Sequence, residues 1–242
     1  DRFLNSDGVE TALNIEEPSR VNIRGEKLDI LKKHMNANDG VRLKYAAKYA
    51  QISNYWKYFI GQQKGLKRQH VYERKKDQET ALMAWVNADP ARQLKYGELA
   101  KDLSDGYAEQ AKYQKGYVYL QEAAFGSEMV VFGFRMYGLM MQMEKDPKGT
   151  AKITAMGEMV KKSARDFWKN YDPATDQEVT AAMFAMIHKD VPADQQPDVV
   201  ATVTKKYKGD FGKWAEAMFK TSILTDSTRL MAFLAKPQLK VL

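Results

Sequence analysis

Few side chains in this sequence could perform catalysis together. The three histidines are His34, His70 and His188, and no two of them lie one helical turn apart. Zinc sites read from local sequence usually place two such ligands on one helix face, and the chain has no cysteine to supply a thiolate. The sequence therefore predicts no metal site, no cofactor and no disulfide.

A serine nucleophile is equally poorly supported. The one Gly-Ser pair, Gly126-Ser127, lies in an apolar stretch that is expected to be helical and lacks the flanking glycines of a nucleophile elbow. His188-Lys189-Asp190 and Asp210-Phe211-Gly212 resemble two protein-kinase loops, but Gln195 stands where the kinase mechanism needs asparagine. The sequence predicts no catalytic residue within this chain.

A basic cluster is the first candidate for binding. It comprises Lys64, Lys67, Arg68, Arg74, Lys75 and Lys76, with Tyr72 among them. Such residues can contact phosphates while the ring stacks on a base. The alternative is a solvated helix face, because Glu73, Asp77 and Glu79 supply acidic partners at helical spacing. We favour the solvated face.

Asn54 is the second candidate. It lies beside, and not within, an apolar stripe that contains Tyr55, Trp56 and Phe59. Small polar residues in mid-helix do not serve helix propensity. Asn54 can be a surface residue, or its carbonyl oxygen can accept a hydrogen bond from a ligand's amine while the aromatic residues hold the helix in place. Spacing alone favours the surface residue and leaves both readings open.

The elements that would position these residues are almost all helical. The chain has 242 residues, 44% of them hydrophobic, and a net charge of +7. Helices are expected over 19–37, 39–65, 66–88 and 89–124, then after Asp146-Pro147 and Asp172-Pro173, and over 194–207, 211–220 and 227–235. Asp39 is the expected cap of the second helix, and residues 3–12 are expected to form a turn-like lead-in. No alternating strand pattern is evident, so the fold class is an all-α, multi-helix bundle.

One apolar run has about the length of a membrane span. It extends over residues 125–143 and contains Glu128, Arg135 and three glycines. Two ionised groups near mid-bilayer would cost roughly 2.5–3.5 kcal/mol each. The run is therefore predicted to be a central buried helix, with Met136, Met140, Met141 and Met143 mostly in the core, and no membrane span is expected.

Two segments give the chain a family resemblance. They read VRLKYAAKYAQISNYWKYFIGQQKGLKR (41–68) and ALMAWVNADPARQLKYGELAKDL (81–103). Both resemble the helical domain of the bacterial family-46 serine dipeptidyl-peptidases, and the flanking DRFLNSDGV and FLAKPQLKVL are also similar. The resemblance implies that the helical domain is inserted as a lid in a chymotrypsin-like double β-barrel peptidase. It divides this chain into residues 1–17, a connection from the missing barrel, and residues 18–242, a C-terminally truncated lid.

The resemblance also implies a role for Asn54. In that family an asparagine of the helical domain helps to hold the ammonium group at the substrate's N-terminus, and its place in the string SNYWK corresponds to Asn54. Ser53, Lys57 and Tyr58 are expected to line the cleft beside it. The catalytic triad belongs to the barrels, so this piece is expected to be inactive alone, while the parent enzyme removes dipeptides from free N-termini.

The implied partners are peptides with a free N-terminus and the missing catalytic domain, with no nucleic acid. The implied location is the periplasm or the cell surface of a Gram-negative bacterium, and the parent is compatible with a homodimer. Penultimate-residue specificity, acidic or hydrophobic, is not encoded in this piece. A second hypothesis remains: a freestanding helical module that binds an acidic partner or nucleic acid through the basic cluster.

Overall fold

The computed structural model describes residues 3–237, and these are arranged entirely as helices, turns and short connections, without a strand. The all-α prediction is confirmed. The longer helices are α2 (Glu17–Ala37), α3 (Asp39–Arg68), α4 (Val71–Asn87), α6 (Leu99–Glu122), α7 (Glu128–Lys145), α8 (Thr150–Lys169) and α9 (Pro173–Asp190). The shorter ones are α1 (Ser6–Thr11), α5 (Pro90–Tyr96), α10 (Asp198–Tyr207), α11 (Phe211–Thr221) and α12 (Ser227–Ala235).

The first helical segment is one rod. Helix α1 passes through a π-helical turn at Ala12–Glu16 directly into α2, so the expected turn at residues 5–8 is wrong. Asn5 caps the rod, because its side-chain oxygen accepts a hydrogen bond from the Gly8 N–H at 3.0 Å. The same Asn-Ser-Asp residues that suggest a turn also favour helix N-termini. The rod continues through the boundary expected at residue 17, and the division of the chain into residues 1–17 and 18–242 stays a prediction. Residues 1–2 and 238–242, at the outer ends of these two parts, lie outside the described residues.

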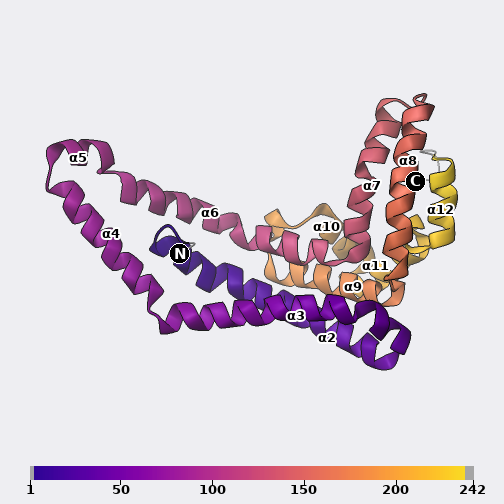
Figure 1. Cartoon of the computed structure of the whole chain (residues 1–242), viewed down its shortest axis with the longest axis horizontal. Helices are drawn as coiled ribbons and strands as arrows, with labels where there is room; N and C mark the ends of the chain where they lie inside the picture. Colours follow the sequence, from indigo (N-terminus) through magenta and orange to yellow (C-terminus); the bar gives the residue numbers. More distant parts are fainter. Residues whose placement is uncertain (1–2, 238–242) are drawn as a thin grey trace.

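Helices α3 to α6 form a long arm (Figure 1). Helix α3 packs along α2, α4 leads away from it after a left-handed residue at His70 (φ 50°), and α5 lies at the tip. The single helix expected over 89–124 is interrupted after Tyr96. At Gly97 a Cβ atom would lie 2.6 Å from the Gln93 carbonyl oxygen, so this turn requires glycine.

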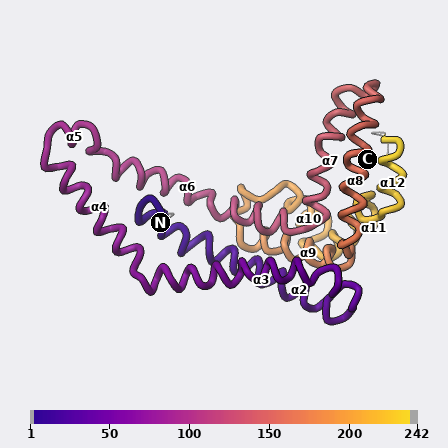
Figure 2. The backbone as a smooth tube through the Cα atoms, viewed as in Figure 1, coloured from indigo at the N-terminus to yellow at the C-terminus, as the bar shows by residue number. Residues whose placement is uncertain are grey.

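The other half of the fold holds most of the core. Helices α7, α8 and α12 stand as a bundle at one end of the arm, and α9 and α11 pack at its base (Figure 2). One hydrophobic cluster joins α2 and α3 to α9, α10 and α11, and a second one fills the α7–α8–α12 bundle. Met136 and Met143 are buried there as expected, whereas Met141 is half exposed.

The shape is extended for the chain's size. Its accessible surface is 14660 Å² for a mass of 27.7 kDa. A compact monomer of this mass is expected to expose about 11,000 Å². The excess of roughly a third comes with large hydrophobic side chains on the surface, among them Leu43, Leu94 and Phe134.

Most of the apolar run forms α7, which buries one face and leaves Phe134 and Tyr137 exposed on the other, so it is not the central buried helix expected. In the part of the chain that the structure describes, no helix combines the length and the hydropathy needed to cross a bilayer. The helix begins later than expected, however, because Phe125 and Gly126 form a 3₁₀ turn and Ser127 is the N-cap of α7.

Candidate functional site

Asn54 lies on the outer face of α3. Its side chain is exposed, and helical spacing places Lys57 and Tyr58, both also exposed, on the same side of the helix. Ser53 flanks this face and is half-buried. The structure therefore brings the four predicted site residues onto one exposed strip, which we call the Asn54 strip. Its role in binding stays a prediction.

The opposite face of α3 fixes the helix against α2. The Trp56 indole N–H donates to the Val21 carbonyl oxygen at 3.0 Å. The Phe59 ring is buried, and the guanidinium groups of Arg20 and Arg24 lie 5.3 and 5.2 Å from its centroid. Because α3 has a rigid seat, the Asn54 strip is held in a defined direction.

An ion pair extends this seat to α6. Arg24 binds Glu122 through two parallel hydrogen bonds, of 2.9 and 3.0 Å. The Arg24 guanidinium also lies 5.4 Å from the ring of Tyr55, which is 52% exposed. Tyr55 was expected in the core. It packs instead against an arginine at the surface, where its hydroxyl group can stay in water.

The strip does not form a closed pocket by itself. Within the described chain no hydrogen bond or ion pair of the Asn54 side chain is present, and the polar cavity beside α3, described next, is lined by other residues. Helix α4 is also mostly exposed: Leu82 and Trp85 are 44% and 51% exposed, and Val86 is its one buried residue.

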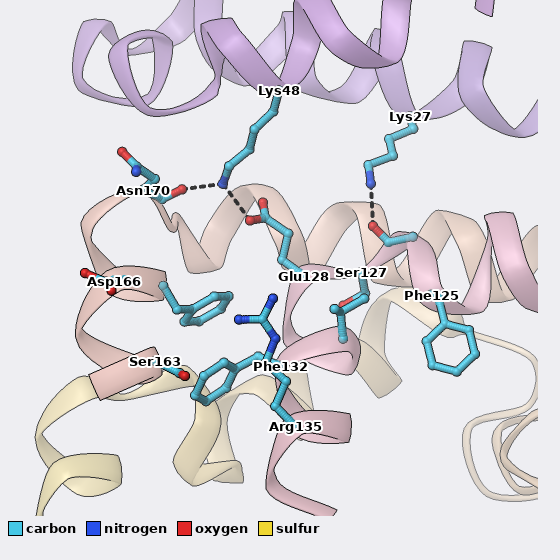
Figure 3. A pocket seen from close by; sticks show the side chains of 13 residues that line it. Lys27, Lys48, Phe125, Ser127, Glu128, Phe132, Arg135, Ser163, Asp166 and Asn170 are labelled. Atoms are coloured by element: carbon cyan, nitrogen blue, oxygen red, sulfur yellow. Dashed lines mark hydrogen bonds and ion pairs between the residues drawn. The ribbon is translucent and has the colours of Figure 1, made fainter. Parts of the chain in front are cut away.

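A cavity of about 460 Å³ lies where α2 and α3 meet α7 and α8 (Figure 3). Lys48 of α3 reaches across to Glu128, at 2.5 Å, and to the Asn170 carbonyl oxygen. Lys27 of α2 donates to the Gly126 carbonyl oxygen. These lysines tie the first half of the chain to the second. We call this space the α7–α8 cavity.

A buried carboxylate organises the helix junction beside the cavity. Asp176 of α9 is 2% exposed and accepts hydrogen bonds from the backbone N–H groups of Glu128 and Met129, both at 2.8 Å. The hydroxyl groups of Ser127 and Tyr171 donate to it at 3.2 and 3.1 Å. Burial raises the pKa of Asp176 above its ordinary value, and the two backbone donors partly oppose this.

Two neighbouring groups have pKa values that move in the direction expected for burial. Burial lowers the pKa of Lys27, against the opposing effect of Glu128 and Asp176. Burial, reinforced by Glu128, raises the pKa of Tyr45. The junction thus holds charge in a poorly hydrated place, an arrangement typical of structural networks and of functional sites alike.

Sequence reasoning missed this junction. Glu128 and Arg135 were noticed only as charges that disfavour a membrane span. Their separation of seven residues places them on one helix face, and that spacing in an otherwise apolar helix is a signal that could have found them. Asp176 gave a weaker signal, as an acidic residue in the first turn of a helix.

The candidate catalytic and metal residues stay dispersed. His34 pairs with Glu178 at 2.7 Å, His70 stands at the α3–α4 turn, and His188 packs against the Phe211 ring. Ser127 donates to Asp176, and it caps α7 by accepting a hydrogen bond from the Val130 N–H. Among residues 3–237 no group of three or more His, Asp or Glu side chains could hold a metal ion.

The basic cluster spans the α3–α4 turn. One acidic residue pairs with the cluster as expected for a solvated helix face: the Lys76 ammonium group lies 3.7 Å from the Glu79 carboxylate. Glu79 in turn accepts hydrogen bonds from the Ser6 backbone N–H and hydroxyl, at 2.5 and 3.0 Å. Part of the cluster's acidic complement therefore holds the N-terminal rod to α4.

Comparison with known proteins shows which family this chain belongs to. The chain is 36% identical over 235 residues to dipeptidyl-peptidase 7 of Porphyromonas gingivalis, covering 97% of this chain and 32% of that protein. It is 27% identical over 234 residues to the Asp/Glu-specific dipeptidyl-peptidase of Flavobacterium psychrophilum, covering 96% and 32%. The chain thus spans about a third of the length of these relatives.

Solved structures share the fold. The crystal structure of Porphyromonas endodontalis DPP11 in complex with the dipeptide Arg-Glu matches with a TM-score of 0.78 at 22% identity, covering 98% of this chain and 34% of that one. The family model of peptidase S46 matches residues 1–241. The helical chain with the exposed Asn54 strip therefore belongs to the peptidase S46 family.

Proposed function

We propose that this chain is the helical lid domain of a serine dipeptidyl-peptidase, in which Asn54 helps to hold the free N-terminus of the substrate. Family membership over residues 1–241 is the observation that carries the proposal. The extended shape supports it, because an accessory domain that packs against a larger body exposes more apolar surface than a compact monomer does.

The chemistry of Asn54 suits this role. A dipeptidyl-peptidase must measure two residues from the N-terminus, so it needs an acceptor at a fixed distance from the nucleophile. An amide oxygen accepts a hydrogen bond from an ammonium group without placing a second charge in the cleft when the site is empty. The Trp56 and Phe59 contacts fix the helix that carries this oxygen. Ser53, Lys57 and Tyr58 would border the bound peptide.

The test substitutes Asn54 in the longer dipeptidyl-peptidase that contains this chain. A hydrogen bond to a charged group contributes about 1.5–3 kcal/mol. Asn54→Ala is therefore expected to lower kcat/KM for dipeptidyl substrates by about ten- to a hundredfold. Asn87→Ala, at an exposed asparagine of α4 outside the Asn54 strip, is the matched control and should leave kcat/KM unchanged. Equal values for wild type and Asn54→Ala would refute the assignment.

The chain alone is proposed to be inactive, since the triad, the oxyanion hole and the other amine-binding residues would lie in the double β-barrel. Purified chain should release no dipeptide from a peptide with a free N-terminus, and adding the barrels should restore hydrolysis. Hydrolysis by the chain alone would contradict this. The parent is proposed to act in the periplasm or at the cell surface, which cell fractionation would test.

The freestanding binding module remains the alternative. It predicts salt-dependent, micromolar binding of nucleic acid or an acidic protein through the basic cluster. The Lys76–Glu79 contact weakens this alternative, because it uses one cation of the cluster within the fold. A fluorescence titration with single-stranded oligonucleotides separates the two: binding that disappears in Lys67→Gln would favour the module.

A further inference from the structure

The α7–α8 cavity contains an arginine without a partner. Arg135 lines the cavity, and its guanidinium group lies below Glu128 in the view of Figure 3. Within residues 3–237 it forms no hydrogen bond or ion pair. Five donors in a rigid, planar fork are thus open to a ligand.

The other charges around the cavity are already engaged. Lys48 binds Glu128, Lys27 donates to a backbone carbonyl oxygen, and Asp166 pairs with Lys169 at 2.9 Å. The lining includes three cations, Lys27, Lys48 and Arg135, against the two carboxylates of Glu128 and Asp166. With Lys27 protonated this leaves one positive charge, and Arg135 is the group that can present it.

The walls beside the arginine are aromatic. The Phe167 ring lines the cavity together with Val131, and it stacks on the buried Phe132 ring behind it with centroids 4.5 Å apart. The volume of about 460 Å³ far exceeds that of a lone carboxylate and falls within the range of small-molecule sites. The cavity therefore has room for an acidic group and the chain that carries it.

The balance of charge selects among anions. A planar carboxylate matches the guanidinium fork through two parallel hydrogen bonds and carries a single negative charge. A phosphate dianion would bring a second negative charge close to the carboxylates of Glu128 and Asp166, which repel it.

We propose that the α7–α8 cavity binds a peptide carboxylate, with Arg135 holding the charged group and Phe167 packing against the attached chain. The carboxylate can be a C-terminus or an acidic side chain, and these two sources share the same recognition chemistry. None of the residues that line the cavity belongs to the Asn54 strip. The proposed carboxylate site therefore does not depend on the proposed peptidase function.

The test is calorimetric titration of the 242-residue chain with two acetylated probes. N-acetylglycylglycine offers a C-terminal carboxylate, and N-acetylglutamic acid α-amide offers an acidic side chain. At least one probe should bind saturably, and the one that does identifies the source. The corresponding neutral amides should bind about ten- to a hundredfold more weakly, as expected for loss of a charge-assisted pair.

Two variants locate the binding. Arg135→Gln should weaken the binding by about ten- to a hundredfold, whereas Arg165→Gln, an exposed arginine of α8 outside the cavity lining, should leave it unchanged. Val131→Trp should also abolish binding by filling the cavity. The proposal is overturned if neither probe binds, if the amides bind equally well, or if Arg135→Gln and Arg165→Gln behave alike while both remain folded by circular dichroism.

Discussion

Removal of the Asp176 carboxylate should destabilise the junction between the two halves of the fold. Asp176→Ala deletes the acceptor of two backbone N–H groups at the start of α7, and of the hydroxyl groups of Ser127 and Tyr171. The hydroxyl groups can rotate toward other acceptors. The two N–H groups have fixed directions, so they are the donors that stay unsatisfied.

The expected magnitude follows from these contacts. Each unsatisfied buried donor costs about 1–3 kcal/mol, so the pair costs about 4 kcal/mol. Deletion of the carboxylate also removes the cost of burying its charge, which we take to offset about 1 kcal/mol. The net loss in the free energy of unfolding is about 3 kcal/mol. For a chain of this length that lowers Tm by about 6–12 °C.

Thermal unfolding followed by circular dichroism measures this loss. The control is Asp166→Ala, since Asp166 is exposed on α8 and forms its one ion pair within residues 3–237 with Lys169, so the change in the free energy of unfolding should stay within about 0.5 kcal/mol. A Tm for Asp176→Ala within about 2 °C of wild type, or equal to that of Asp166→Ala, would show that the α7 N-terminus does not depend on this carboxylate.

Three further predictions concern capping and ionisation. Asn38→Ala should lower the free energy of unfolding in urea by about 1 kcal/mol, because the Asn38 side chain accepts a hydrogen bond from the Val41 N–H at 3.1 Å. Asp39→Ala should lower it by less than about 0.5 kcal/mol. Equal losses for the two variants would contradict the assignment of Asn38 as the cap. Lys27→Met removes the donor to the Gly126 carbonyl oxygen, so it should lower the free energy of unfolding by about 1–3 kcal/mol. Because the pKa of Lys27 is lowered when folded, the unfolded chain binds more protons between that pKa and 10.5. Wild-type stability therefore rises with pH there and the deficit of the methionine variant grows; a pH-independent deficit would refute this. Burial and Asp190 raise the pKa of Tyr119 from 10.0 to about 12, so stability should fall between those values as pH rises. Tyr119→Phe should make this fall smaller in alkaline urea titrations, the remainder coming from Tyr45 and Tyr171, whose pKa values burial also raises; an unchanged fall would count against the role of Tyr119.

Most of the helices could be predicted from the sequence, because local signals determine where they form. Asp89 and Asp172 cap α5 and α9 as their Asp-Pro dipeptides predict. Helix starts were misplaced where several capping residues adjoin. Asn38 and not Asp39 caps α3, and Asn5 caps a rod that was expected to begin at Ser19. Such choices depend on which side chain reaches the backbone, and composition alone does not determine this.

The candidate sites were harder to predict from the sequence, for a physical reason. Periodicity identifies the apolar side of a helix but does not say whether another helix covers it. Tyr55 and Trp85 fit an apolar stripe, yet both are about half exposed because the arm is thin. The Asp176 junction joins α9 to the first turn of α7, a long-range contact that no local pattern encodes. Asn54 was identified through family resemblance and not through its spacing.

The thin arm has a consequence for how the molecule opens. Helix α5 has no buried residue and α4 has only Val86, whereas seven residues of α9 are buried. Local opening costs least where few apolar contacts must separate. Backbone amides of α5 should therefore exchange with deuterium at a small fraction of the protection found in α9. The distant end of the arm can adapt to what it contacts while the α7–α9 junction keeps its packing, so the chain combines a compliant tip with a stiff base.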